Sequence, residues 1–258
     1  MKNSSQNTKD YISYSRYKMF SECGWRYRLV YKDKVPFYSS NEFTAFGTAI
    51  HATCENVLFG NKQAEPENYF VEQFAESRKE VEKPNDELAE QMLAQGKTIL
   101  PQVQGAVQNL FGDYEVVATE EELLEPISDD LDFKGYIDMV LKTADGKYHI
   151  LDWKTCSWGW NAQKKSSKLM TYQLTLYKKY FCQKHNINPN NVETYFGLLK
   201  RTPKKNNVEI FRVTSGNKKT ENALKSLNNF VYNVEKGLYF KNRLSCRYCS
   251  FYKTEHCR

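Results

Sequence analysis

The sequence has no apolar run that approaches the ~20 residues needed to cross a bilayer, and its first residues lack the apolar stretch of a signal peptide. Mean hydropathy is −0.71, and 40% of the 258 residues are hydrophobic. Internal repeats and low-complexity segments are also missing. These absences predict a soluble globular protein with its own core and no membrane partner, and we expect it in the cytoplasm.

A phosphate-binding loop is another feature that the chain lacks. Gly96-Lys97-Thr98 resembles the end of such a loop, but Gln91 stands where the pattern needs its first glycine. The pattern also needs a preceding strand, whereas this stretch has helical spacing. The sequence therefore does not support motor or ATPase activity.

Charge and aromatic rings are plentiful by comparison. The chain has 37 Lys and Arg residues against 31 Asp and Glu, which gives a net charge of +6, and it has 18 tyrosines. Basic charge attracts polyanions, and aromatic rings beside it suit stacking on nucleic-acid bases. The composition thus fits a nucleic-acid partner without requiring one.

The order of expected elements indicates the fold class. Helices are predicted over about 13–30, 42–59, 168–185 and 219–236, and two more begin at Pro66 and Pro84, the second ending at Gly112. Strands are predicted over about 114–124, 131–142, 147–155, 192–201 and 207–214. This order predicts an α/β or α+β fold, in a single domain over residues 1–258.

A hairpin lies at the centre of this pattern. Residues 135–138 and 150–154 both belong to stretches that alternate apolar and polar side chains, and Ala144-Asp145-Gly146 lies midway between them. Alternation interrupted by Asp-Gly is typical of two strands joined by a tight turn. We therefore expect the two runs to be neighbours in one sheet.

The register of that hairpin decides which charges meet. The two-residue period of a strand puts Asp152 and Lys154 on one face. A loop at 144–146 sets Asp138 opposite Asp152, with Cβ atoms roughly 4.5–5.5 Å apart, whereas a loop at 145–146 turns Asp138 away. We predict the first register. Two carboxylates this close repel each other unless a cation such as Mg²⁺ or Mn²⁺ binds; the alternative is three solvated charges on an exposed strand.

Other side chains could complete such a site. His51 is a good Mn²⁺ ligand when neutral, and it lies four residues before Glu55, on the same helix face. Gln173 and Tyr177 are also four apart, so both can point at one ligand. The acidic run Glu120, Glu121 and Glu122 could supply another oxygen. The alternative for the histidine is a core or surface position, and for the other pair an ordinary helix face.

Taken in chain order, these motifs resemble a known family. The set Gly47-Thr48-Ala49-Ile50-His51, Glu120, Gly135-x2-Asp138, Asp152-x-Lys154 and Gln173-x3-Tyr177 is similar to the RecB-type nucleases of the PD-(D/E)XK superfamily. That group includes AddB-like and CRISPR-associated RecB-like iron–sulfur nucleases and phage exonucleases. The segment from Tyr11 to Tyr27 also resembles the family's N-terminal part, so the resemblance spans about residues 11–257.

The resemblance implies a restriction-endonuclease-like core, a mixed sheet flanked by helices. Residues 11–113 would form a helical part that carries His51, residues 114–236 the catalytic core, and residues 237–258 a Cys-rich tail that pairs with Cys23. It also implies roles within the site. His51, Asp138, Asp152 and Glu120 would bind the metal, Lys154 would be the catalytic lysine, and Gln173 and Tyr177 would lie near the scissile strand.

Cysteines form the second signal. Seven is an odd number, which with an intracellular location argues against a disulfide framework. Cys246-x2-Cys249-x7-Cys257 lies near the end of the sequence, and Cys23 lies far upstream. Four thiolates suit an iron–sulfur cluster or Zn²⁺. The resemblance implies a 4Fe–4S cluster, although the last spacing is longer than is usual in the family. Zinc, with His256 as a further ligand, and free thiols are the alternatives.

The resulting hypothesis is a Mg²⁺- or Mn²⁺-dependent DNA nuclease. The family favours exonuclease action on DNA ends or single strands in recombination, repair or phage DNA processing, with a separate helicase or recombinase as partner. A phage-encoded chain would work in the host cytoplasm. The alternatives are a CRISPR-adaptation nuclease that trims spacer precursors and a DNA-binding protein of nuclease fold without cleavage. We further expect Trp158, Trp160, Lys164, Lys165 and Lys168 to contact the DNA strand, unless they form a solvated loop.

Overall fold

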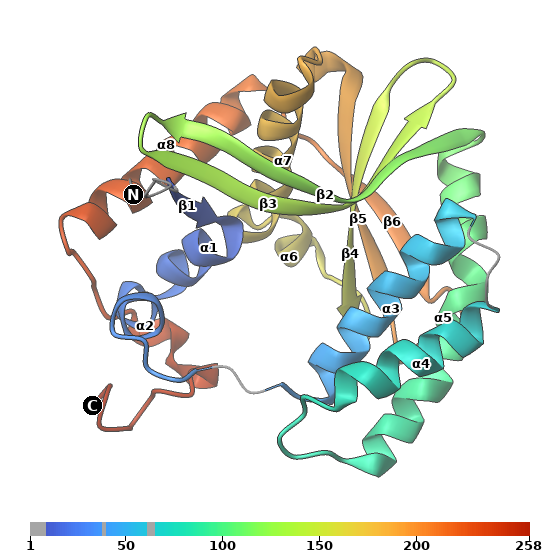
Figure 1. The fold of residues 1–258 in the computed structure, drawn as a ribbon, viewed down its shortest axis with the longest axis horizontal. Coiled ribbons are helices and arrows are strands. Elements are labelled where there is room, and N and C mark those ends of the chain that lie inside the picture. The colour runs from blue at the N-terminus through green and yellow to red at the C-terminus, as the bar shows by residue number, and fades with distance from the viewer. Residues whose placement is uncertain (1–8, 38–39, 61–64) are drawn as a thin grey trace, which may run out of the picture.

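The computed structural model describes residues 9–37, 40–60 and 65–258. Its centre is a six-stranded mixed sheet (Figure 1). Five strands follow the order β1-β3-β4-β5-β6, and the sixth, β2, lies off this path and pairs with β3 along its whole length. The β1–β3 and β4–β5 pairs are parallel, and the other pairs are antiparallel. The strands are β1 (Asp10–Ser13), β2 (Tyr114–Ser128), β3 (Leu131–Thr143), β4 (Tyr148–Cys156), β5 (Val192–Lys200) and β6 (Val208–Val213). A mixed sheet flanked by helices is the predicted fold class, which is thereby confirmed.

The β3–β4 hairpin has the predicted register. Met139 lies opposite Leu151 and Lys142 opposite Tyr148, so that residues 144–146 form the loop. Gly146 has a φ of +80°, the left-handed conformation that closes a three-residue loop. Its amide donates to the Thr143 carbonyl over 2.9 Å.

The sheet opens where this hairpin should continue. Pairing between β3 and β4 stops at Met139 and Leu151, and beyond that point β4 pairs with β5 alone. At its other end, β3 pairs with β1 over residues 131–134. Figure 1 shows β2 and β3 curving away from β4. We call this opening, between residues 135–138 of β3 and 152–156 of β4, the fork.

Helices cover both faces of the sheet. One face is packed by α3 (Glu42–Phe59), α4 (Pro66–Arg78) and α5 (Asp86–Phe111), around buried rings such as Phe46, Phe70 and Trp153. The opposite face is packed by α1 (Tyr14–Glu22), α7 (Lys168–His185) and α8 (Asn217–Glu235), around Phe133 and Phe196. Among the described residues, no helix is both long and apolar enough to span a membrane. The fork therefore lies between two helical layers.

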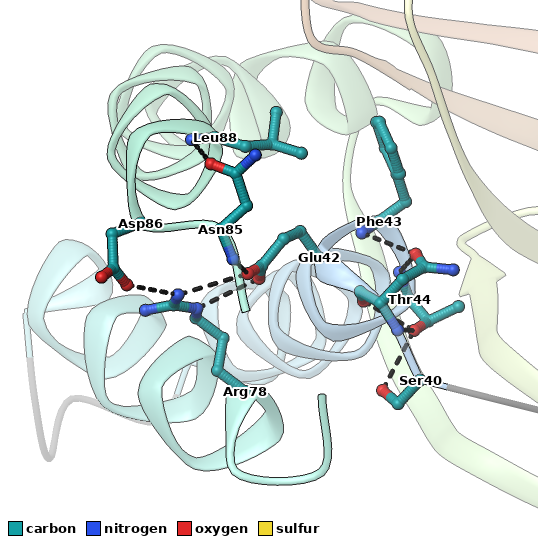
Figure 2. A network of polar contacts seen from close by, with 9 residues as sticks. Ser40, Glu42, Phe43, Thr44, Arg78, Asn85, Asp86 and Leu88 are labelled. Atoms are coloured by element: carbon teal, nitrogen blue, oxygen red, sulfur yellow. Dashed lines mark hydrogen bonds and ion pairs between the residues drawn. The ribbon is translucent and has the colours of Figure 1, made fainter. Parts of the chain in front are cut away.

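The start of α3 is firmly anchored. Asn41 and Thr44 form a capping box, in which the side chain of each bonds the other's backbone. Glu42 is only 3% exposed, and its carboxylate accepts bonds from the Arg78 guanidinium at 3.0 and 3.2 Å and from the Asn85 amide at 2.8 Å. Figure 2 shows this network joining the starts of α3 and α5 to the end of α4. Such a paired and hydrogen-bonded buried carboxylate fixes the helix end in place.

The N-terminal helix differs from the prediction. Ser13 caps α1 as expected, but the helix ends at Glu22 and is followed by α2 (Gly24–Tyr27) and a π-helical turn (Arg28–Lys32). Cys23 between them is extended, with φ −164° and ψ 110°. The continuous helix over 13–30 is therefore wrong. The interruption lies where a distant part of the chain arrives, because the Trp25 amide donates to the Phe240 carbonyl over 3.1 Å.

Two short elements were not expected. Strand β1 has four residues, of which Asp10 and Ser13 are polar, so it carries almost no alternation. The basic linker contains a one-turn helix, α6 (Ala162–Ser166), capped by Asn161.

Helix α5 begins after Asn85 rather than at Pro84. The remaining described residues include two 3₁₀ turns, Pro189–Asn191 and Arg243–Tyr248.

The last residues of the sequence pack against the break after α1. The Asn242 side chain and the Ser245 hydroxyl both donate to the Glu22 carbonyl, at 2.9 and 2.7 Å. The Trp25 indole donates to the His256 carbonyl at 3.0 Å. In Figure 1 the C-terminus accordingly lies next to α2.

Candidate active site

Three carboxylates form a row across the fork. Continued one residue past its last pair, Met139 and Leu151, the register of β3 and β4 sets Asp138 across from Asp152. On the other edge of β3, Glu120 of β2 lies between the pairs Thr119–Met139 and Glu121–Ile137, and so comes across from Asp138. The φ of Glu120 is +48°, which interrupts regular pairing at this point of β2.

Both aspartates have defined partners. Oδ2 of Asp138 accepts a 2.7 Å hydrogen bond from the Trp153 amide. Asp152 is 1% exposed, and its Oδ2 lies 2.5 Å from the Lys154 ammonium. The predicted patch of two carboxylates and one ammonium is therefore present, with Lys154 directed at the acidic row.

Helix α3 supplies side chains from one side of the fork. Nδ1 of His51 lies 3.6 Å from Oδ2 of Asp138. One turn further along the helix, Glu55 interacts with Glu120, whose charge raises the pKa of Glu55. A hollow of about 660 Å³ exposes these groups to solvent. Its polar lining includes Thr44, Thr48, His51, Glu55, Glu120 and Lys154.

Helix α7 reaches the fork from the other side. Gln173 donates to Oδ1 of Asp152 over 2.8 Å, and its amide nitrogen lies 3.2 Å from the Tyr177 hydroxyl. A Cβ on Gly135 would lie 2.7 Å from the Tyr177 ring, so glycine is needed for that ring to approach β3. Gln173 and Tyr177 line a second hollow, of about 460 Å³, together with Tyr11 and Tyr136. The acidic row thus has one hollow on each side.

Burial controls the protonation of the aspartates. It raises the pKa of Asp138 and of Asp152 to about 6, against the opposing effect of the Lys154 charge. Burial acts to lower the pKa of Lys154, but Asp152 and Asp138 outweigh it, and the net shift is upward. Lys154 therefore carries its charge at neutral pH.

The groups from α3 and β2 are shifted as well. Burial and the Lys154 charge lower the pKa of His51 to about 4, so the imidazole is neutral at physiological pH and free to act as a ligand. Burial, together with Glu120 and Asp138, raises the pKa of Glu55 to about 8. Burial also raises the pKa of Glu120. Such shifts are the expected result of crowding four carboxyls around one ammonium.

The donors suit a hard divalent cation. Carboxylate oxygens and a neutral imidazole are ligands for Mg²⁺ and Mn²⁺, and the excess of carboxyls over cationic groups would be relieved by a bound cation. As the side chains are placed, no three of the described His, Cys, Asp and Glu residues converge closely enough to hold a metal ion. Lys154 pairs with one oxygen of Asp152.

The structure brings all the predicted site residues on β2, β3, β4, α3 and α7 to this fork: His51, Glu120, Asp138, Asp152, Lys154, Gln173 and Tyr177. It also separates the three glutamates of the acidic run. Glu121 pairs with Lys184 and His185, while Glu122 pairs with Lys134. Glu55 is an additional member, which the spacing of four from His51 had placed on the same helix face.

The four predicted cysteine ligands line one small pocket between α2 and the C-terminal segment: Cys23, Cys246, Cys249 and Cys257. All are free thiols, and Cys257 is buried. The Asn242 amide donates to the Cys23 sulfur over 3.5 Å. Arg26, Lys241 and Arg243 line the same pocket. The thiols share a pocket but do not converge as metal ligands within the described part of the chain.

The basic linker is divided by the structure. Trp158 is 71% exposed, whereas Trp160 is 8% exposed and packs against Phe196 and Phe211. Lys165 forms an ion pair with Glu209. Of the two indoles expected to face DNA, Trp160 therefore belongs to the core, because its ring completes an aromatic cluster.

Comparison with solved structures shows a similar fold. A candidate exonuclease from Eubacterium rectale is 13% identical, with a TM-score of 0.61, over 96% of this chain and 90% of that one. The protein SSO0001 is 14% identical, with a TM-score of 0.45, over 95% and 84% of the two chains. LHK-Exo in complex with dAMP is 12% identical, with a TM-score of 0.31, over 76% and 94%. Comparison with curated proteins gives no match.

The family model of the PD-(D/E)XK nuclease superfamily matches residues 11–254. This match contains the fork, both hollows and the helices that line them. The chain therefore belongs to the PD-(D/E)XK nuclease superfamily.

Proposed function

We propose that this nuclease is a Mg²⁺- or Mn²⁺-dependent deoxyribonuclease that hydrolyses phosphodiester bonds, and that it acts as an exonuclease on DNA ends or single strands. The observation that carries the proposal is the register that sets Asp138 across from Asp152, with Lys154 beside them. The fold it shares with a candidate exonuclease, together with a net charge of +6, supports DNA as the substrate.

His51, Glu120, Asp138 and Asp152 are the residues that would hold the metal. When bound, the ion supplies Lewis acidity for the phosphate and for the attacking water. Burial raises the pKa of Asp138 and of Asp152 to about 6, so at neutral pH both would be largely ionised and able to act as ligands. His51 enters this set as a neutral ligand, because its pKa is lowered to about 4.

Lys154 acts as a cation rather than as a base. Its raised pKa keeps the ammonium protonated at neutral pH, so that it orients the water and stabilises charge that develops on the phosphate. Gln173 holds one oxygen of Asp152 through a hydrogen bond. Burial raises the pKa of Tyr177, so its hydroxyl stays neutral and can donate a hydrogen bond. Neither residue needs to change protonation during the reaction.

In the cell this activity would serve recombination, repair or phage DNA processing, with a separate helicase or recombinase supplying strand separation or exchange. A CRISPR-adaptation nuclease that trims spacer precursors uses the same chemistry on a different substrate. A protein that binds DNA without cleaving it is a poorer fit, because the acidic row and Lys154 are intact.

We also propose that Cys23, Cys246, Cys249 and Cys257 hold a 4Fe–4S cluster, with zinc as the alternative. The support is that all four thiols line one pocket, whose Arg26, Lys241 and Arg243 would offset the negative charge of a thiolate-bound cluster. Its role would be to join the break after α1 to the C-terminal segment.

A cleavage assay tests the nuclease proposal. Single- and double-stranded DNA, labelled at one end, are incubated with Mn²⁺, Mg²⁺ or EDTA, and the products are resolved by length. We expect metal-dependent release of short products from an end. Absence of cleavage of every substrate with either metal would refute the proposal.

A further inference from the structure

An exposed aromatic ring stands at the edge of the α3 hollow. Phe43, in the first turn of α3, lines the same hollow as His51 and Lys154, and 51% of its surface is exposed. Large apolar side chains on a surface are ordinary when scattered, but this one borders the candidate active site. Its position therefore needs an explanation beyond packing.

The backbone of Phe43 is held rigidly. Its amide donates to the Asn41 side chain over 2.9 Å as part of the helix cap, and its neighbour Glu42 is anchored to Arg78. In Figure 2 the Glu42 side chain points to the network, whereas Phe43 points away from it. A ring carried by a fixed helix end loses little conformational entropy when a ligand stacks on it.

A cation covers part of this ring. The Arg201 guanidinium lies 4.8 Å from the centroid of the Phe43 ring, which is a cation–π contact. Arg201 is itself fixed, since its side chain donates to the Ser157 hydroxyl over 3.1 Å and its amide to the Cys156 carbonyl over 2.9 Å. The ends of β4 and β5 thus hold the guanidinium against the ring at the hollow that contains Lys154.

From this geometry we infer that Phe43 and Arg201 form a stacking platform for one unpaired base of the DNA strand whose phosphate enters the α3 hollow. The inference rests on the proposed nuclease function and extends it to the choice of substrate. The exposed part of the ring offers a π surface to the base, and Arg201 adds a positive charge near the adjoining phosphate.

The platform selects for single-stranded DNA. Inside a duplex, both faces of every base are already stacked on neighbours, so a base can reach Phe43 only from a single strand or a frayed end. Base–aromatic stacking tolerates any sequence because every base has a π face. The platform should therefore distinguish strandedness and not sequence.

Helix α3 provides a matched control. Phe59, in its last turn, is 60% exposed and does not line the hollow. Phe43→Ala and Phe59→Ala each remove one phenyl ring, at opposite ends of the same helix. Phe43→Trp keeps an aromatic surface at the platform. Equal melting temperatures for the variants and the parent protein show that each one is folded.

The experiment measures binding of fluorescently labelled oligonucleotides by anisotropy, with Ca²⁺ in place of the reactive metal. We expect Phe43→Ala to weaken single-strand binding roughly tenfold, consistent with the loss of one stacked base. Binding of a blunt duplex should change little, as should binding of either DNA by Phe59→Ala or Phe43→Trp. In cleavage assays with Mn²⁺, Phe43→Ala should raise KM for single strands more than it lowers kcat.

An abasic scan identifies the stacked nucleotide. One abasic position should weaken binding to the parent protein about as much as Phe43→Ala does, and should have no further effect in that variant. Additive losses, or equal losses for single strands and duplex, would overturn the platform. If the parent protein cleaves DNA and Phe43→Ala binds and cleaves single strands equally well, the platform is wrong and the nuclease proposal stands. If the parent protein cleaves no DNA, the nuclease proposal itself is wrong.

Discussion

The amide of Trp153 donates a 2.7 Å hydrogen bond to Oδ2 of Asp138. This bond crosses the point at which β3 and β4 stop pairing, so a side chain satisfies a backbone donor that the opening of the sheet leaves without a strand partner. Asp138 is therefore part of the fold at the fork as well as a candidate metal ligand. Substitutions here must be chosen to separate these two contributions.

Single substitutions of Asp138, Asp152 and Lys154 separate metal binding from catalysis. Asp138→Asn keeps an oxygen for the Trp153 amide but loses the charge, so we expect weaker Mn²⁺ binding in a folded protein, and the same for Asp152→Asn. Lys154→Ala should bind Mn²⁺ at least as tightly as the parent protein, because a nearby positive charge is removed, while cleavage falls about 10²–10³-fold. Calorimetric Mn²⁺ titration and cleavage rates measure the two effects. Loss of metal binding in Lys154→Ala, or intact cleavage in Asp138→Asn, would contradict these roles.

Glu55 predicts a pH dependence of stability in metal-free protein. Its pKa is raised to about 8, so the folded protein keeps a proton that the unfolded chain has already lost. The contribution of Glu55 to the free energy of unfolding should therefore fall as the pH rises from about 4 to 8 and level off above that, whereas His51, whose pKa is lowered to about 4, contributes in the opposite direction below a pH of about 6.5. Asp138 and Asp152 contribute in the same direction only below a pH of about 6.

The change in the free energy of unfolding between pH 7 and 8 should therefore come mainly from Glu55. Urea unfolding in EDTA should show a decline of at most ~1.4 kcal/mol per pH unit for one proton. Glu55→Gln should flatten it, while Glu115→Gln, at an exposed position on β2, should not. An unchanged slope in Glu55→Gln would show that another group holds the proton.

Gly135 controls the approach of Tyr177 to the fork. The added methyl of Gly135→Ala would lie 2.7 Å from the Tyr177 ring, so we expect displacement of that ring, a loss of stability of ~1–3 kcal/mol and slower cleavage. Gly105→Ala is the control, because its Cβ meets nothing within 4 Å and alanine favours the interior of α5. Thermal unfolding and cleavage rates compare the two. Similar behaviour of both variants would show that the close approach is unimportant.

Arg78 neutralises a buried carboxylate at the start of α3. Arg78→Met would leave Glu42, which is 3% exposed, without its counter-charge, and should cost about 3–5 kcal/mol of stability. Adding Glu42→Gln to Arg78→Met should restore part of the loss, because no buried charge remains. Urea unfolding of the single and double variants measures this coupling. A double variant as unstable as Arg78→Met would rule out the unpaired charge as the cause.

The cysteine pocket predicts a coloured protein. Purified without oxygen, the chain should be brown and contain iron and sulfide, as measured by absorbance and metal analysis. Cys23→Ser should lower thermal stability, because a bound metal group adds directly to folding free energy. Stoichiometric zinc without iron would favour the alternative, and unchanged stability in Cys23→Ser would argue against a structural role.

Much of the central fold was predictable because its signals are local. Alternation and the Asp-Gly turn gave the hairpin register, and Gly146 adopts the expected positive φ. Helix α7 has the predicted bounds, and α4 begins at Pro66 as expected. Spacing alone brought Asp138, Asp152 and Lys154 together, whereas the grouping of His51, Glu120, Gln173 and Tyr177 with them was implied by the family resemblance.

The remaining features depend on contacts between distant parts of the chain. The break at Cys23 lies where residue 240 reaches the N-terminal helix, and nothing near Cys23 in sequence announces it. Trp160 looked like a surface ring beside lysines, yet packing against Phe196 draws it into the core. Strand β1 forms only because β3, more than a hundred residues later, offers a parallel edge. Tertiary context decides such cases.

The fork also bears on how the two halves of the molecule unfold. The layer of α3, α4 and α5 and the layer of α1, α7 and α8 have separate hydrophobic cores, and at the fork β3 and β4 no longer join them. His51 belongs to the first layer, and Gln173 of the second layer holds Asp152. A ligand bound by both His51 and Asp152 is therefore lost when either layer opens. Its binding free energy therefore opposes the opening of both layers at once and makes the protein melt as a more cooperative unit.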